Sequence, residues 1–357
     1  MGSGIETPNI DQLANNGMVF NQFYNAGRCC PTRASLLTGL YAHNTGLGWM
    51  TASDLGKPGY RGTISKNTIT LAQVLKTEGY QNYLTGKWHI VSDKNLEQEA
   101  DNSNWPIQRG FDKYYVVLTG KGGYYSPTTL TKNNKRITAL DNFYLTEAIN
   151  NSTIEILEEH FETKKNTPFF FHVAHFAPHR PLHALEDDIK KYKGKFSKGW
   201  DYFREQRFNK MNEIGLSNDW ALSKRPKNIP AWNSLSEKEK NMWEMLMEVY
   251  AAQIDRMDQG IGRIISLLKE KKQALNKNNN FLYPSKKPLT YSATSTKIET
   301  KSKILKEKDF TLAKSIFNLI KKNKWNAALE QTKKIKDKEF KNLVTWIHLK
   351  LPNNQAS

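Results

Sequence analysis

Cysteine, long apolar runs and C-terminal arginine are scarce in this chain of 357 residues. It has two cysteines, and because they are adjacent they cannot link distant segments, which excludes a disulfide framework. The sequence has no run of 18 apolar residues, so we expect no transmembrane helix. The first residues do not combine a basic stretch with an apolar one, so we expect no signal peptide either.

The net charge of +18 is unevenly distributed along the chain. Residues 271–357 contain 20 lysines and six acidic residues but no arginine, so most of the excess charge lies there. Arginine is the side chain best suited to reading bases, because its planar fork forms paired hydrogen bonds. A lysine-rich segment without arginine indicates a solvated surface, and we expect no nucleic-acid partner.

The segment richest in potentially functional side chains is Cys-Cys-Pro-Thr-Arg at residues 29–33. Pro31 suits the first turn of a helix and Gly39 suits its end, which predicts a helix beginning just after Cys29. A helix N-terminus attracts anions, and Arg33 can reach back to it with a permanent positive charge. A thiol, an anion site and a cation at one helix end suggest chemistry on an oxyanion ester. Taken alone, the motif leaves open that Cys29 is merely a small buried residue.

Apolar periodicity predicts alternating helices and strands, which indicates an α/β fold with a mixed or parallel sheet. The predicted helices cover residues 9–17, 69–76, 142–163 and 236–268, and the last begins with the capping box Ser236/Glu239. Strands are predicted at residues 18–24, in the first half of 80–89 and at 168–176. The last strand is a continuous apolar run, which is typical of a buried central strand.

The composition changes after Lys272. We expect an α/β domain over residues 1–272, a linker rich in Lys, Asn and Ser over 273–307, and a small α-helical tail over 308–357. The tail shows three amphipathic segments in series. Part of its sequence resembles the helical scaffold of soluble lytic transglycosylases, namely Trp325-Asn326-Ala327-Ala328-Leu329 and Leu343-Val344-Thr345-Trp346. The alternative is an undistinguished helical tail.

Four sequence blocks follow one another in a characteristic order. They are Thr-Pro-Asn-Ile-Asp-Gln-Leu-Ala at 7–14, the Cys29 motif through Leu-Leu-Thr-Gly at 36–39, Gly-Lys-Trp-His at 86–89 and Ala-Pro-His at 177–179. Together they closely resemble the sulfatase family of the arylsulfatase type. The resemblance implies an alkaline-phosphatase-like mixed sheet flanked by helices. It also implies a sulfuric ester hydrolase that cleaves sulfate monoesters.

The resemblance assigns roles to individual residues. It implies that a formylglycine-generating maturation enzyme oxidises Cys29 to formylglycine, the nucleophile that attacks sulfur, with Cys30 as a variable position. Arg33 is implied to orient that group and screen its charge. Lys87 is implied to contact the sulfate, and His89 to support the formylglycine hydroxyl. His179 is implied to contact the sulfate or the leaving oxygen and to act as the acid.

The family binds a divalent cation, usually calcium, through carboxylate oxygens, with formylglycine from Cys29 as a further ligand. The Asp-Asp pair expected before Thr7 and the Asp-Asn-Gly or Asp-His-Gly segment expected after the long helix do not occur. We therefore expect an internal piece of a sulfatase joined to unrelated helical sequence, with exposed sheet edges and an incomplete calcium site. Other candidate ligands have structural interpretations: His43, His172 and His175 as packing residues, Asp11 as a local cap, and Asp255 and Asp258 as solvated or ion-paired groups.

Three functions follow from these expectations. The first is a sulfatase with impaired metal binding. The second is an inactive remnant that binds sulfated or other anionic glycans through Arg33, Lys87 and the basic tail; added calcium would change a rate only in the first case. The third is a phosphoester hydrolase, against which Cys29 argues because those relatives place Ser or Thr at the nucleophile. Family members are often periplasmic or secreted, but the sequence itself gives no location.

Overall fold

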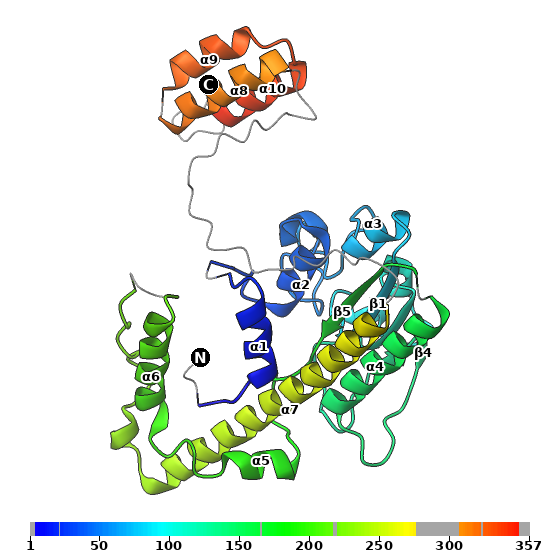
Figure 1. Cartoon of the computed structure of the whole chain (residues 1–357), viewed down its shortest axis with the longest axis vertical. Coiled ribbons are helices and arrows are strands. Elements are labelled where there is room, and N and C mark those ends of the chain that lie inside the picture. The colour runs from blue at the N-terminus through cyan, green and yellow to red at the C-terminus, as the bar shows by residue number, and fades with distance from the viewer. Residues whose placement is uncertain are drawn as a thin grey trace. The chain divides into compact units, whose positions relative to one another are not determined.

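The computed structural model describes residues 4–20, 22–164, 166–216, 220–275, 307–322 and 324–349. The chain divides into two compact units, residues 1–287 and 288–357, and each is described by itself. The first unit is a mixed sheet flanked by helices, and the second is helical (Figure 1). Apart from its two ends, the linker predicted over 273–307 lies outside the described residues.

Within the described residues, the sheet of the first unit has five strands in the order β4-β3-β2-β1-β5. Their bounds are β1 Gln81–Lys87, β2 Lys113–Val117, β3 Leu130–Lys132, β4 Lys135–Arg136 and β5 Phe169–Ala174. β1 is parallel to both β2 and β5, whereas β3 and β4 are antiparallel to their neighbours. The carboxyl ends of the three parallel strands therefore lie together, at the edge where open α/β sheets bind ligands.

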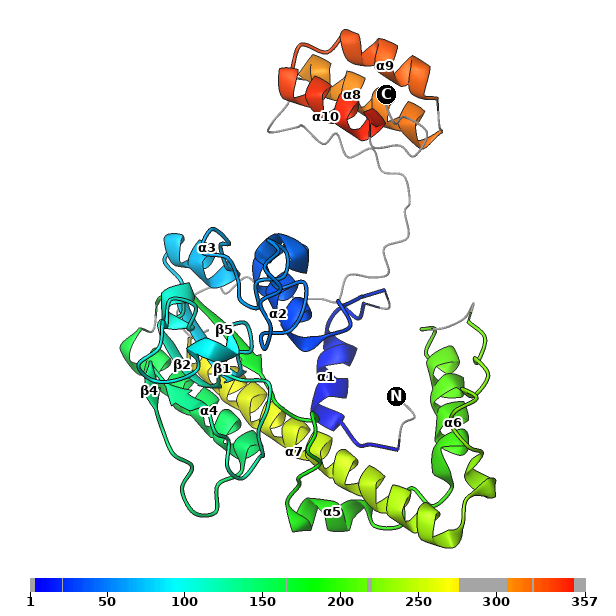
Figure 2. The same cartoon turned by 180° about the vertical axis from the view of Figure 1, so that it is seen from behind.

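Helices cover both faces of this sheet (Figure 2). Their bounds are α1 Pro8–Asn16, α2 Cys29–Thr38, α3 Leu71–Thr77, α4 Leu145–Thr163, α5 Glu186–Tyr192, α6 Gly199–Glu213 and α7 Glu237–Leu275, with short 3-10 turns at Ala42–Thr45, Asp93–Asn95, Ile107–Arg109 and Trp232–Ser234. The long α7 helix packs against α1, α4 and α5. The helices predicted from periodicity are confirmed, including the capping box at Ser236 and Glu239.

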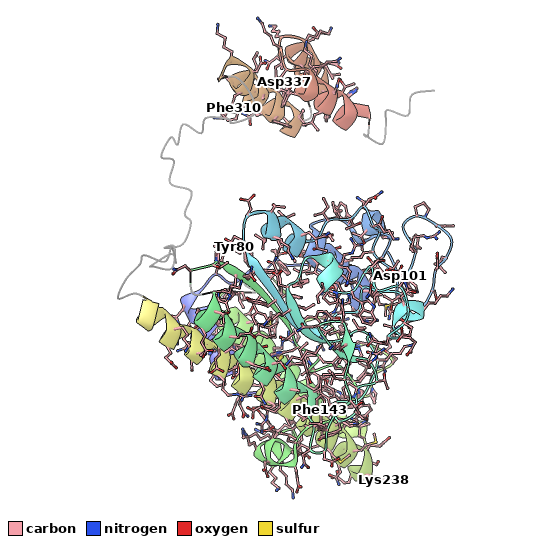
Figure 3. All side chains as sticks on the ribbon, turned by 90° about the vertical axis from the view of Figure 1, so that its right-hand side faces the viewer. Tyr80, Asp101, Phe143, Lys238, Phe310 and Asp337 are labelled. Carbon is pink, nitrogen blue, oxygen red and sulfur yellow. The ribbon has the colours of Figure 1, made fainter. Side chains whose placement is uncertain are left out.

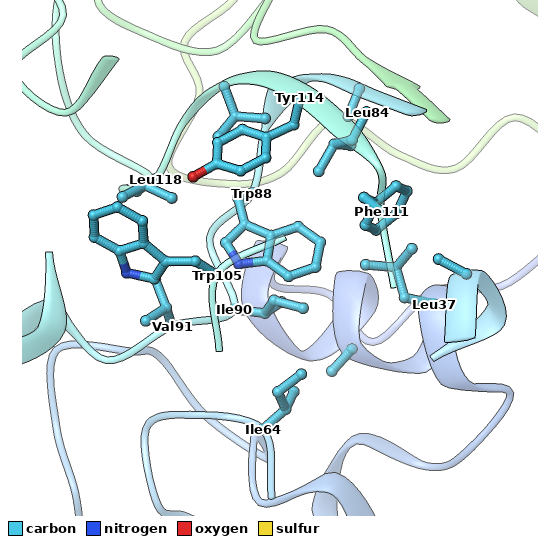
Figure 4. Close-up of a cluster of buried hydrophobic side chains, with 14 of the residues drawn as sticks. Leu37, Ile64, Leu84, Trp88, Ile90, Val91, Trp105, Phe111, Tyr114 and Leu118 are labelled. Carbon is cyan, nitrogen blue, oxygen red and sulfur yellow. The ribbon is translucent and has the colours of Figure 1, made fainter. Parts of the chain in front are cut away.

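Alternating side chains along β2 supply two separate cores. Tyr114 and Val116 enter a core that also contains Leu37 of α2, whereas Tyr115 and Val117 enter a core with Ile149 of α4. Figure 4 shows the first of these cores, in which the rings of Trp88 and Phe111 meet edge to face at 5.8 Å. These buried aromatic side chains hold the segment that follows β1 against the sheet.

Two predictions about strands are wrong. The described residues of 18–24 form no strand, and Phe20 and Tyr24 are 66% and 84% exposed. A β-rich segment becomes a strand only when it finds a pairing partner, and no described strand pairs with this one. The apolar run at 168–176 does contain a strand, β5, but it lies at an edge of the described sheet, with Phe169–Val173 only half-buried. An apolar run indicates burial without fixing the number of neighbouring strands.

In its described residues, the second unit has three helices, as predicted: α8 Glu307–Lys321, α9 Trp325–Lys333 and α10 Lys338–Leu349. Its core includes Ile316, Ala328 and Val344, all fully buried. Phe310 of α8 and Asp337 before α10 are labelled in Figure 3. The resemblance of this unit to the lytic transglycosylase scaffold stays a prediction. Nowhere in the described part of the chain does a helix combine the length and apolar character needed to cross a membrane.

Candidate active site

Cys29 is the first residue of α2, one position further into the helix than the sequence predicted. Arg28 precedes the helix in an extended conformation, and the left-handed Gly39 ends it at φ 69°. The Thr32 hydroxyl accepts a hydrogen bond from the Ala26 amide at 3.2 Å, which holds the incoming loop. The half-buried Cys29 sulfur therefore lies at a helix N-terminus, where free amides favour negative charge.

Lys87 and His89 lie where β1 ends. Trp88 between them points into the first core, and both Lys87 and His89 are buried, with 3% and 5% of their surface exposed. His89 has a φ of 55°, which is uncommon for a residue with a side chain. Its ring packs so closely on Gly120 that a Cβ there would lie 1.8 Å from Cε1. The backbone thus fixes the His89 imidazole tightly beside α2.

Arg33 ties α2 to the end of β1. Its Nη1 donates a hydrogen bond to the Lys87 carbonyl at 2.6 Å. Gly86 lets β1 pack closely on β5 at this point. Its φ is 106°, and a Cβ at this position would lie 1.9 Å from the Ala174 carbonyl oxygen. Two cations, Arg33 and Lys87, are consequently held at one helix end next to Cys29.

The cations and hydrogen bonds around Cys29 favour its ionised form. A hydrogen bond from Cys30, another from His89 and the charge of Lys87 lower the pKa of Cys29 to about 3. The same hydrogen bond, together with burial, raises the pKa of Cys30. Burial lowers the pKa of Lys87, while the charge of Cys29 opposes this shift. The unmodified site therefore contains a thiolate among positive charges.

His179 is exposed and joins this group through Phe176. The rings of His179 and Phe176 lie 5.3 Å apart, and Lys87 Nζ lies 5.2 Å from the same Phe176 ring. His179 Nδ1 donates to the Arg180 carbonyl at 2.6 Å, which leaves Nε2 as the atom available to a ligand. Of the five predicted site residues, four meet directly and His179 lies beside them across one aromatic ring.

His172 lines the cavity beside Cys29, although its place in an apolar run predicts a packing role. The cavity has a volume of about 420 Å³ and is lined by Cys29, Arg33, His172 and Ala174 among others. Burial and the charge of Arg33 lower the pKa of His172 to about 4, so its ring is neutral at pH 7. The alternation of side chains along a strand could have predicted this position, because His172 and Ala174 lie on the same face.

The remaining candidate side chains have structural roles. His175 bonds to Asn150 Oδ1 of α4 at 3.1 Å, and His43 contacts the Tyr60 hydroxyl at 3.0 Å. Asp255 pairs with Lys191 at 3.2 Å. Asp258, expected to be solvated or ion-paired, instead accepts backbone N–H bonds from the first turn of α1 at 3.1 and 2.8 Å. It is a tertiary cap of that helix.

The donor atoms near Cys29 do not fit calcium. In the described ranges, a single group of three potential metal-binding side chains is found, Cys29, Cys30 and His89, and it offers two sulfur atoms and one nitrogen. Calcium takes about six to eight oxygen ligands, chiefly from carboxylates and carbonyls. The calcium expected from the resemblance therefore lacks its carboxylate ligands among the described residues.

Comparisons with known proteins identify the family of the chain. The sulfatase family model matches residues 1–277. The chain therefore belongs to the sulfatase family. An uncharacterized sulfatase of Schizosaccharomyces pombe is 30% identical over 293 residues, covering 75% of this chain and 51% of the yeast protein. The arylsulfatase of Klebsiella aerogenes is 28% identical, over 75% of this chain and 58% of its own length.

The fold is also that of solved sulfatases. A putative sulfatase from Bacteroides fragilis superposes with a TM-score of 0.57 at 22% identity, covering 75% of this chain and 54% of that one. This likeness confirms the alkaline-phosphatase-like mixed sheet flanked by helices. The chain spans about half the length of the yeast and Klebsiella relatives.

Proposed function

We propose that this protein is a sulfuric ester hydrolase of the arylsulfatase type, acting on sulfate monoesters in the cavity beside Cys29. The observation that carries the proposal is the meeting of Cys29, Arg33, Lys87 and His89 at one helix N-terminus. A sulfate ester is a tetrahedral monoanion, and negative charge develops on its leaving oxygen as the S–O bond breaks. The buried Lys87, the half-buried Arg33 and the free helix amides are suited to binding such an anion.

The chain's own residues divide the work among them. Arg33 and Lys87 bind and neutralise the sulfuryl oxygens. When Cys29 is converted to formylglycine, that group supplies a hydrated aldehyde as nucleophile and a route for sulfate release. His89 holds the nucleophile by its fixed ring and exchanges a proton with it. His179, through Nε2, delivers a proton to the leaving oxygen from the exposed side of the cavity.

The described residues do not by themselves form a calcium site. The sulfur and nitrogen donors beside Cys29 do not suit that ion. The family's divalent cation would need carboxylates from outside the described group. We therefore propose that substrate binding is intrinsic to this chain and that turnover requires added calcium, at a concentration high enough to offset the weakness of the site.

The test is turnover of 4-nitrophenyl sulfate by the whole chain, co-expressed with a formylglycine-generating enzyme, with and without calcium. Mass spectrometry of the peptide containing Cys29 reports conversion. We expect calcium-dependent turnover that disappears in Cys29→Ala, with conversion retained in the matched control Cys30→Ala. Complete conversion without turnover in calcium would overturn the hydrolase proposal.

No carboxylate joins the ligand group at Cys29 in the described ranges, which favours one second function: binding of anionic glycan esters without hydrolysis. Arg33 and Lys87 would supply that affinity, and charge screening by salt would weaken it. Heparin retention that falls with salt, is insensitive to calcium and is lost in Lys87→Met would support it. Retention that persists in Lys87→Met would exclude this site as its source.

A further inference from the structure

The two adjacent cysteines and His89 form a constellation that the proposed hydrolysis does not use as a set. Sγ of Cys29, Sγ of Cys30 and a ring nitrogen of His89 all lie within 4.8 Å of one another. In a tetrahedral zinc site with Zn–S bonds near 2.3 Å, the two sulfurs are about 3.8 Å apart. Small side-chain adjustments would therefore bring the three atoms onto one ion. We propose that the unmodified chain binds a single thiophilic divalent cation of the zinc type through Cys29, Cys30 and His89.

The chemistry of the three donors selects the kind of cation. Two sulfurs and an imidazole nitrogen are the ligands of zinc, whereas calcium and magnesium prefer oxygen. Two thiolates balance the charge of a divalent ion, so the ion–dithiolate unit is neutral among Arg33 and Lys87. Binding releases the proton of the Cys30 thiol to solvent and forms two metal–sulfur bonds and one metal–nitrogen bond.

The surroundings of the cluster are prepared for an additional ligand. His89 Nδ1 is buried and has no hydrogen-bond partner, so the hydrogen bond between His89 and Cys29 is assigned to Nε2, the nitrogen placed to bind an ion. Cys30 is completely buried, and its contact with the Thr51 hydroxyl is long, at 4.0 Å. Because Cys29 also lines the 420 Å³ cavity, a fourth ligand can enter from that side. Three protein ligands and one open position are typical of an exchangeable zinc site.

The site would exist only before maturation. Oxidation of Cys29 to formylglycine removes one of the two sulfurs, so the bound cation and the modified residue exclude each other. This consequence rests on the proposed function, whereas the metal site itself does not. A cation held by Cys29 would also shield the thiol from other reagents until maturation occurs.

The experiment uses the whole chain, expressed without a maturation enzyme, reduced and freed of metal. Titration with Co²⁺ should give sulfur-to-cobalt charge-transfer absorption that saturates at one equivalent, and Zn²⁺ should displace it. Loss of a partner outside the ligand set costs a site about 10–100-fold in affinity. Cys30→Ala and His89→Ala should therefore each weaken zinc binding by more than about a hundredfold. His43→Ala, which alters an exposed histidine elsewhere, should bind zinc like the parent.

The outcomes separate the two proposals. Absence of saturable cobalt absorption, or equal zinc affinity in Cys30→Ala, overturns the metal site, and circular dichroism of this small-to-small variant verifies its fold. Equal zinc affinity in a chain fully converted to formylglycine overturns it as well. If the chain binds one zinc through these residues but is never converted at Cys29, the metal site stands and the formylglycine mechanism fails.

Discussion

Two charged clusters of the first unit differ in how their charges are matched. At the end of β1, Arg33 and Lys87 surround Cys29 without a carboxylate partner in the described ion pairs. Beside α5 and α7, the buried Asp188 receives two hydrogen bonds from Arg256, at 2.7 and 3.0 Å. Arg256 in turn pairs with Glu147 of α4 at 3.2 Å. The first cluster has an excess of positive charge, and the second is balanced.

The difference separates a binding role from a structural one. A balanced, bidentate cluster satisfies its own groups and joins three helices, so removing one member leaves another charge unpaired. An unbalanced cluster is tolerable only if the thiolate or an incoming anion completes it. We therefore expect substitutions in the two clusters to affect different measurements, stability in one and anion chemistry in the other.

The largest contrast is expected in the reactivity of Cys29 at low pH. A lowered pKa means that the thiolate persists as the pH falls, so its alkylation rate should stay nearly constant from pH 8 to pH 5. An ordinary thiol, with a pKa near 8.5, loses roughly a thousandfold of its thiolate over that range. The measurement is iodoacetamide labelling of Cys29 followed by mass spectrometry, with free cysteine as the reference. A thousandfold decrease for Cys29 as well would show that the cations do not stabilise its charge.

Removing one member of the balanced cluster should give the next largest effect. In Asp188→Ala, Arg256 loses its bidentate partner inside the protein, and the free energy of unfolding should fall by about 3 kcal/mol. Urea denaturation of the whole chain measures this change. Binding of inorganic sulfate should stay within twofold of the parent. A weakened sulfate affinity in the folded variant would contradict the separation of the two clusters.

Motifs located the residues of the candidate site, but geometry was needed to complete it. Cys29, Arg33, Lys87 and His89 were chosen from family-like motifs, and they do meet. The role of Cys30 could not be predicted, because adjacency in sequence does not show that two thiols on a helix share a proton. His172 was missed because the continuous apolar run around it obscured the alternation that directs it to the cavity.

The fold class was predictable because strongly periodic helices alternate with apolar strands, and α4 and α7 follow those patterns closely. The position of β5 at the edge of the described sheet was not predictable, since an edge strand and a central strand can carry the same residues. Asp258 shows a further limit: its role as a cap of α1 depends on a contact almost 250 residues away in the sequence. Local patterns do not encode such a partner.

Substitution of the buried Lys87 should have the opposite effect to Asp188→Ala: sulfate binding should weaken while stability is kept. The changes should also be smaller. Lys87→Met removes a desolvated cation next to Arg33, so the free energy of unfolding should stay constant or rise by up to about 1 kcal/mol. The affinity for inorganic sulfate should fall about tenfold, which corresponds to 1.4 kcal/mol of lost interaction. Isothermal titration calorimetry measures the affinity, and Asp188→Ala is the matched control. Unchanged sulfate affinity would remove Lys87 from the anion site.

The smallest effect is expected at the rim of the balanced cluster. Lys191 pairs with Asp188 at 3.6 Å and with Asp255 at 3.2 Å, yet half of its side chain is exposed. Solvent screens such pairs, so Lys191→Ala should lower the free energy of unfolding by less than about 1 kcal/mol. Urea denaturation beside Arg256→Ala, which leaves Asp188 without its bidentate partner and should cost about 3 kcal/mol or more, makes the comparison direct. Equal losses in the two variants would show that the number of ion pairs, rather than their burial and geometry, sets the stability of this cluster.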